Sequence, residues 1–186
     1  MKPYSKSVRP IKSYRETYSM FKFIVLLSFL FTTLFAQQNG EEFHFLGFTA
    51  STDSMDFDSM ADAGNQDETT FGLRYGRQTL DWRTVFTISG NSDLQTFAVE
   101  VDKILVDALF GMPEIRPYLG ATVGYLHYDN PYTSDSDGYY YGGNFGLLFY
   151  ATDTIDVDLS YHYYGISKLD PFDTMQGASL SIHFFY

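Results

Sequence analysis

The sequence predicts an all-β fold, an eight-stranded antiparallel up-and-down transmembrane β-barrel preceded by a cleaved signal peptide. The last ten residues provide the first observation, because apolar and small or polar side chains alternate along them with the period of a strand. About ten residues is also the length that a tilted strand needs to cross a bilayer. The second observation is an apolar segment near the N-terminus with the layout of an export signal.

The export signal is predicted from residues 22–36. Lys22 precedes an apolar run at 23–35, and Ala36 follows as the small residue before the expected cleavage site. The run is shorter than the roughly 20 residues of a membrane-spanning helix, so a retained anchor is the weaker interpretation. We therefore expect residues 1–36 to be an N-terminal extension and signal peptide, with Met20 as an alternative start, and 37–186 to be the barrel domain.

Charge and composition exclude several classes of protein. Six of the 12 basic residues and only one of the 23 acidic residues precede the expected cut, so the mature chain carries six basic and 22 acidic residues, a net charge of −16. Nucleic-acid binding depends on basic side chains and is not expected. The chain has no cysteine, which rules out disulfides and thiolate chemistry, and no cofactor is expected.

Eight segments of the mature chain alternate with period two, and in most of them one face is apolar while the other is small or polar. In the first segment the facing is ambiguous, because Phe43 and Phe45 lie opposite Leu46 and Phe48. The predicted strands span about 42–50, 70–78, 81–89, 96–105, 116–127, 141–150, 155–164 and 177–186. Four aromatic residues near strand ends are candidates for interfacial girdles: Trp82, Tyr118, Tyr125 and Tyr150.

The predicted connections mostly alternate between long and short. Long connections are expected at 51–68, 128–140 and 165–176, and tight ones at 77–81 and 151–154. The short connection at 90–95 and the oversized, apolar segment 103–115 depart from this alternation. The sequence does not explain the apolar character of 103–115.

Charged residues fall on the predicted inward face. An eight-stranded barrel is just wide enough for side chains to fill its interior, and unpaired charges there are costly. We therefore expect a lumen charge network in which two arginines bridge carboxylates; a narrow polar path for ions is the alternative. The candidate residues are Arg74, Arg83, Glu100, Asp102, Asp156, Asp158 and His162.

Four stretches carry a resemblance to a known family: 116–125 (RPYLGATVGY), 143–146 (GNFG), 157–163 (VDLSYHY) and 180–186 (LSIHFFY). Together with the signal peptide, they make the chain resemble the small eight-stranded outer-membrane barrels, OmpA-like and opacity-protein-like. In that family a terminal aromatic strand is the signal read by the barrel-assembly machinery, although Tyr stands here where Phe is usual. The matching residues are Leu180, Ile182, Phe184 and Tyr186.

The resemblance implies a monomer in the outer membrane of a Gram-negative bacterium, in contact with outer-membrane lipid and lipopolysaccharide. It implies a structural or surface-interaction role with acidic extracellular loops. A periplasmic peptidoglycan-binding domain is not expected, so that role of the longer family members is not carried over. A narrow porin-like channel is the first alternative, and a lipid A-modifying enzyme is the second.

Candidate chemistry is sparse. His162, Ser160 and Asp158 share one strand face, but their spacing provides no oxyanion site, so no enzyme and no catalytic residue is expected. The acidic runs at 53–67 and 135–137 lack a complete calcium-loop pattern, and we interpret them as solvated loops rather than a metal site. A soluble lipocalin-like binder would need an apolar interior, which the inward faces do not predict.

Overall fold

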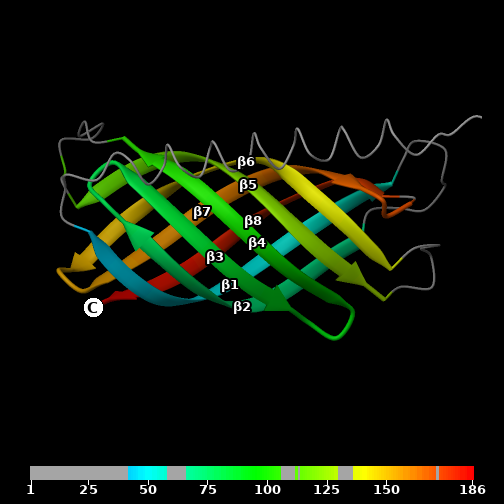
Figure 1. Ribbon diagram of the computed structural model, residues 1–186, viewed down its shortest axis with the longest axis horizontal. Helices are drawn as coiled ribbons and strands as arrows, with labels where there is room; N and C mark the ends of the chain where they lie inside the picture. The colour runs from blue at the N-terminus through cyan, green and yellow to red at the C-terminus, as the bar shows by residue number, and fades with distance from the viewer. Residues whose placement is uncertain (1–41, 58–65, 106–111, 113, 130–135, 171) are drawn as a thin grey trace, which may run out of the picture. The chain divides into compact units, whose positions relative to one another are not determined.

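Eight antiparallel strands close into a barrel in chain order (Figure 1). The computed structural model describes residues 42–57, 66–105, 112, 114–129, 136–170 and 172–186. The strands are β1 (Phe43–Phe57), β2 (Gln66–Gln78), β3 (Trp82–Gly90), β4 (Leu94–Ile104), β5 (Ile115–Tyr128), β6 (Asp137–Thr152), β7 (Ile155–Ser167) and β8 (Phe172–Phe185). The predicted signal peptide at 1–36 lies outside the described residues.

Pairing of β8 with β1 closes the sheet. Its register runs from Phe45 opposite Phe185 to Phe57 opposite Phe172. Closure removes the unpaired strand edges that an open sheet would expose. We call the end of the barrel where β1 begins and β8 ends the terminus end, and the opposite end, with the connections after β1, β3, β5 and β7, the loop end. Within the described residues, no helix is long and apolar enough to cross a membrane.

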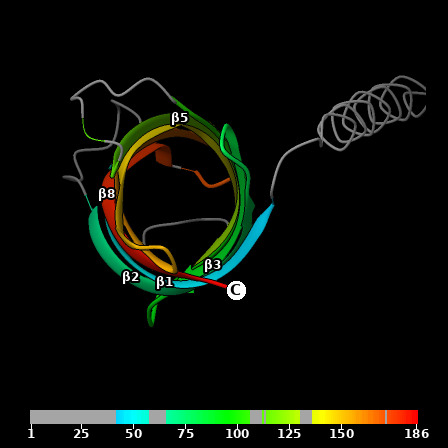
Figure 2. The same cartoon turned by 90° about the vertical axis from the view of Figure 1, so that its left-hand side faces the viewer.

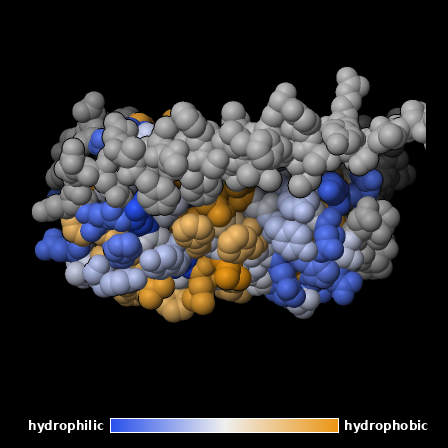
Figure 3. Space-filling view, viewed as in Figure 1, coloured by the Kyte–Doolittle hydropathy of each residue, from blue (hydrophilic) through white to orange (hydrophobic). Residues whose placement is uncertain are grey.

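The outer wall carries an exposed apolar band. Figure 3 shows this band across the middle of the barrel, with polar surface on both sides of it. A soluble protein rarely exposes so large an apolar area, whereas a lipid-facing surface requires it. Among the exposed residues are Leu46, Phe48, Phe71, Leu73, Ile88, Phe97, Leu119, Val123, Phe145, Leu159 and Leu180.

Strand pairing settles the ambiguous facing of β1. Leu46 and Phe48 point outward, with 55% and 62% of their surface exposed, while Phe45 is fully buried in the lumen. The strand also continues to Phe57, well beyond the predicted end at residue 50. The prediction stopped early because the outward residues after Ala50 are polar, yet the ladder with β2 continues as far as Met55.

All three predicted long connections are therefore too long. The one between β5 and β6 is 129–136 instead of 128–140, and the other two differ more. The described strands leave 58–65 between β1 and β2, instead of 51–68. Between β7 and β8 they leave 168–171, instead of 165–176. In both places hydrogen-bonded pairing extends the strands past the apolar band, where alternation of hydropathy no longer marks them.

The interior is less polar than the sequence predicts. A large apolar cluster, the loop-end cluster, fills the lumen near the loop end: Met55, Leu94, Ala98, Leu126, Tyr128, Tyr140, Tyr164, Ile166, Leu169, Phe172 and Met175. A smaller cluster contains Ile104, Tyr118 and Leu148, with Tyr150 packed against it. Tyr118 and Tyr150 thus face inward, and their prediction as girdle residues is wrong, whereas Trp82 and Tyr125 do lie exposed on the outer wall.

Candidate functional site

Arg83 lies at the centre of a charged layer in the lumen. It is fully buried on β3, directly opposite Asp102 on β4. Its Nε lies 2.8 Å from Asp102 Oδ2, and its Nη2 lies 2.9 Å from Asp158 Oδ2 and 3.3 Å from Glu100 Oε1. One guanidinium therefore contacts three carboxylates from two other strands, which a planar group with five donors can do.

Arg74 on β2 binds two of the same carboxylates. Its Nη2 lies 2.8 Å from Glu100 Oε1, and its Nη1 lies 2.9 Å from Asp158 Oδ2. Nη1 also donates to the hydroxyl of Ser181 on β8 at 3.0 Å. The two arginines and their partners connect β2, β3, β4, β7 and β8 across the lumen.

Neutral groups complete the layer. The Tyr118 hydroxyl donates to Asp158 Oδ1 at 2.8 Å, and the Asn144 amide donates to Asp102 Oδ1 at 3.0 Å. The Arg83 guanidinium also lies 4.5 Å from the centroid of the Tyr118 ring. Hydrogen bonds to the remaining carboxylate oxygens reduce the cost of burying the charges.

Inward glycines let residues two strands apart touch. Gly120 on β5 lies between Asp102 and Asn144 in register, and a Cβ there would collide with the Asp102 carboxylate. Gly177 on β8 lies in the same way between His162 and Asp53. The missing side chains open space that a narrow barrel otherwise lacks.

The structure separates two of the predicted network residues from the charged layer. Asp156 contacts His183 on the neighbouring strand, with Asp156 Oδ1 2.6 Å from His183 Nδ1. His162 Nε2 contacts Asp53 Oδ1 at 2.5 Å. Sequence reasoning missed Asp53 as a lumen residue because it placed this position in a loop; continuing the alternation from Phe45 along β1 would have found it.

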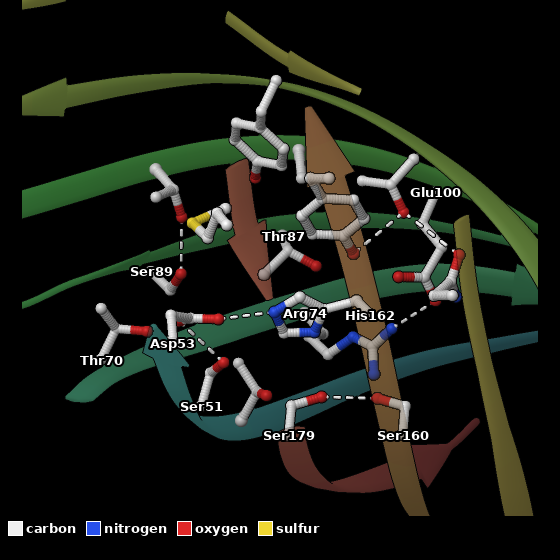
Figure 4. Close-up of a pocket in the computed structure, with 18 residues that line it drawn as sticks. Ser51, Asp53, Thr70, Arg74, Thr87, Ser89, Glu100, Ser160, His162 and Ser179 are labelled. Atoms are coloured by element: carbon white, nitrogen blue, oxygen red, sulfur yellow. Dashed lines mark hydrogen bonds and ion pairs between the residues drawn. The ribbon is translucent and has the colours of Figure 1, made fainter. Parts of the chain in front are cut away.

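A polar chamber lies between the charged layer and the loop-end cluster. It has a volume of about 80 Å³ and is lined by residues that include Thr49, Thr87, Ser160, Ser179 and Arg74. Figure 4 shows the hydroxyl groups and the Arg74 guanidinium around this space. Four members of the loop-end cluster also line the chamber, which places it directly beneath them: Ala98, Tyr140, Tyr164 and Met175.

The described residues form neither a serine–histidine–acid relay nor a metal site. Ser160 pairs with Ser179 at 2.6 Å while His162 pairs with Asp53, so the predicted serine, histidine and acid do not form a relay. No group of three or more His, Asp or Glu side chains in the described ranges could hold a metal ion. The Asp137 carboxylate is hydrogen-bonded to Tyr125 and His127. Asp135, the other acidic residue of that predicted loop, lies outside those ranges.

The terminal strand presents its apolar face outward. Exposed side chains on this face include Leu180, Ile182, Phe184 and Tyr186. The Tyr186 N–H donates to the backbone oxygen of His44 at 3.0 Å, which joins the last residue to the start of β1. Their use as an assembly signal remains a prediction.

Comparison with known proteins shows the class of the fold. The chain has the fold of the small eight-stranded outer-membrane barrels, as its sequence resemblance predicted. Neisserial surface protein A is 17% identical with a TM-score of 0.57, and the match covers 77% of this chain and 97% of that one. Outer membrane protein H from P. aeruginosa is 20% identical with a TM-score of 0.54, covering 77% and 99%. No protein-family model and no curated protein sequence matches the chain.

Proposed function

We propose that the chain is an integral outer-membrane barrel that is closed to ions and has a structural or surface-interaction role. The observation that carries this proposal is the filled interior. The charged layer crosses the lumen, and apolar clusters occupy it on both the terminus side and the loop side. An ion entering this barrel would have to break buried ion pairs and also cross an apolar region.

Location in the outer membrane of a Gram-negative bacterium follows from the same argument. The exposed apolar band needs lipid around it. Support also comes from the two similar structures named above, which are a neisserial surface protein and an outer membrane protein. Outer-membrane lipid and lipopolysaccharide are the partners of the band, and the barrel-assembly machinery is the partner of the terminal strand. Each barrel is complete in itself, which supports a monomer.

The role is non-catalytic in this proposal. Support comes from the pairing of Ser160 and His162 with different partners, since neither is positioned to act on a substrate with the other. The acidic segments near the loop end would then be displayed to the exterior. The net charge of −16 expected for the mature chain makes cationic partners the natural ones for that surface.

Single-channel recording tests the closed state. The mature chain, residues 37–186, is refolded and inserted into a planar bilayer, and folding is checked by the mobility shift of unheated barrel on electrophoresis. We expect no discrete conductance steps. Discrete steps from folded protein would overturn the closed barrel, and steps that change in size on Arg74→Ala would place the channel through the charged layer.

A further inference from the structure

The turn between β7 and β8 places a leucine across the loop end of the lumen. Leu169 is 1% exposed although it belongs to the turn and not to a strand, and it packs in the loop-end cluster. Phe172, just after the turn, meets the Tyr128 ring edge-on with centroids 5.6 Å apart. In Figure 2 the orange turn lies within the ring outline of the barrel.

Local bonding around this turn is weak. Lys168 has a φ of 66°, a backbone conformation that disfavours residues with a Cβ. Among the described residues of the turn, the Phe172 N–H donates to the Leu169 oxygen at 2.8 Å. The Lys168 ammonium rests 5.4 Å from the Tyr139 ring centroid on the outer wall. The free energy needed to open such a segment is lower than that needed to separate the charged layer, because the ion pairs of the layer join several strands.

The chamber beneath the turn has the properties of a hydrated space. Its volume of about 80 Å³ exceeds the roughly 10–15 Å³ that one water needs. Its lining is rich in hydroxyl groups, and Arg74 Nε is buried with no hydrogen-bond partner among the described residues. A buried donor without a protein partner is ordinarily satisfied by water or an ion.

We propose that Leu169, held by residues 168–170, is a hydrophobic cap, and that its displacement admits water and small inorganic ions into the chamber from the loop end. The proposal rests on the closed barrel of the proposed function. The loop-end cluster excludes ions while Leu169 is in place. Displacing Leu169 removes an apolar side chain from this cluster and opens a path to the chamber. The charged layer keeps the chamber separate from the terminus end, so access is from one side.

The absence of cysteine in the chain allows a direct test. Thr87→Cys places one thiol in the chamber wall. The folded protein in lipid vesicles is treated with 2-aminoethyl methanethiosulfonate, a small cation, and the modification rate is followed by mass spectrometry. Adding Leu169→Ser should raise the rate about tenfold or more, because the apolar contacts that hold the turn closed are lost. Leu169→Ala, the milder change, should give a smaller increase and guards against misfolding.

Leu80→Ser is the matched control, since Leu80 is an exposed turn leucine at the terminus end. It should leave the rate unchanged. Equal rates for the Leu169 and Leu80 variants, with all proteins folded, would overturn the cap. Conductance of the Thr87→Cys parent separates the two proposals: discrete steps from the parent would overturn the closed barrel, whereas a silent parent with equal rates would overturn the cap alone.

Discussion

Replacing Arg83 by Met should destabilise the barrel strongly. Arg83 is fully buried and lies within 2.8 to 3.3 Å of three carboxylates, Asp102, Asp158 and Glu100. Methionine fills a similar length of space but leaves these carboxylates to Arg74 and to neutral donors. Removing one partner of a buried ion pair costs about 3–5 kcal/mol, since the remaining charge stays buried without compensation.

The assay is urea unfolding of the refolded barrel in lipid vesicles. Trp82 is the single tryptophan and lies exposed on the outer wall, so its fluorescence reports the loss of the lipid environment. Arg77→Met is the matched control. Arg77 Nε pairs with Glu42 at 3.1 Å, but both side chains are partly exposed, and such a pair contributes less than about 1 kcal/mol.

A double replacement sharpens the test. Asp102→Asn together with Arg83→Met removes one of the carboxylates that Arg83 leaves unpaired. The double variant should therefore lose less free energy of unfolding than the two single variants together. A coupling energy of about 0.5–3 kcal/mol is typical of contacting residues. The reasoning would be refuted if Arg83→Met and Arg77→Met cost the same, or if the two changes at Arg83 and Asp102 were simply additive.

Two further predictions concern space and lipid. Gly120→Ala should lower the free energy of unfolding by about 1–3 kcal/mol by forcing the Asp102 carboxylate aside, measured by the same unfolding assay. Gly143→Ala should be nearly neutral, because a Cβ at this outward position would make only an ordinary contact, 3.7 Å from the Gly120 oxygen. Equal effects would exclude the steric explanation. Leu159→Lys on the apolar band should lower the free energy of unfolding in vesicles by about 2–4 kcal/mol. Thr154→Lys in the terminus-end turn should lower it by only about 0–1 kcal/mol. Equal losses for the two variants would argue against lipid at the band.

Period-two alternation was sufficient to place many side chains correctly. Phe71, Leu73 and Tyr75 lie outside and Arg74 inside, as the spacing along β2 predicts. The same rule failed in β1, where apolar side chains fall on both faces. It also failed beyond the apolar band, because a strand that leaves lipid keeps its hydrogen bonds and loses its hydropathy pattern.

The sequence does not predict which charged side chains pair inside the lumen. Arg83 and Asp102 are opposite in register and could have been paired once β3 and β4 were aligned. Arg74 and Asp158 come from strands that are not neighbours, and they meet because the barrel is narrow. His162 reaches Asp53 only across Gly177, so a missing side chain on a third strand decides that contact.

The sequence by itself determined the class of fold, the outward apolar faces and the inward position of the charges, because these depend on local periodicity and on the cost of placing a charge in lipid. Only the tertiary structure decided which charges meet, where the apolar clusters close the lumen and how Leu169 reaches the interior from a turn. These depend on distances across a closed barrel, which residues far apart in the chain determine together.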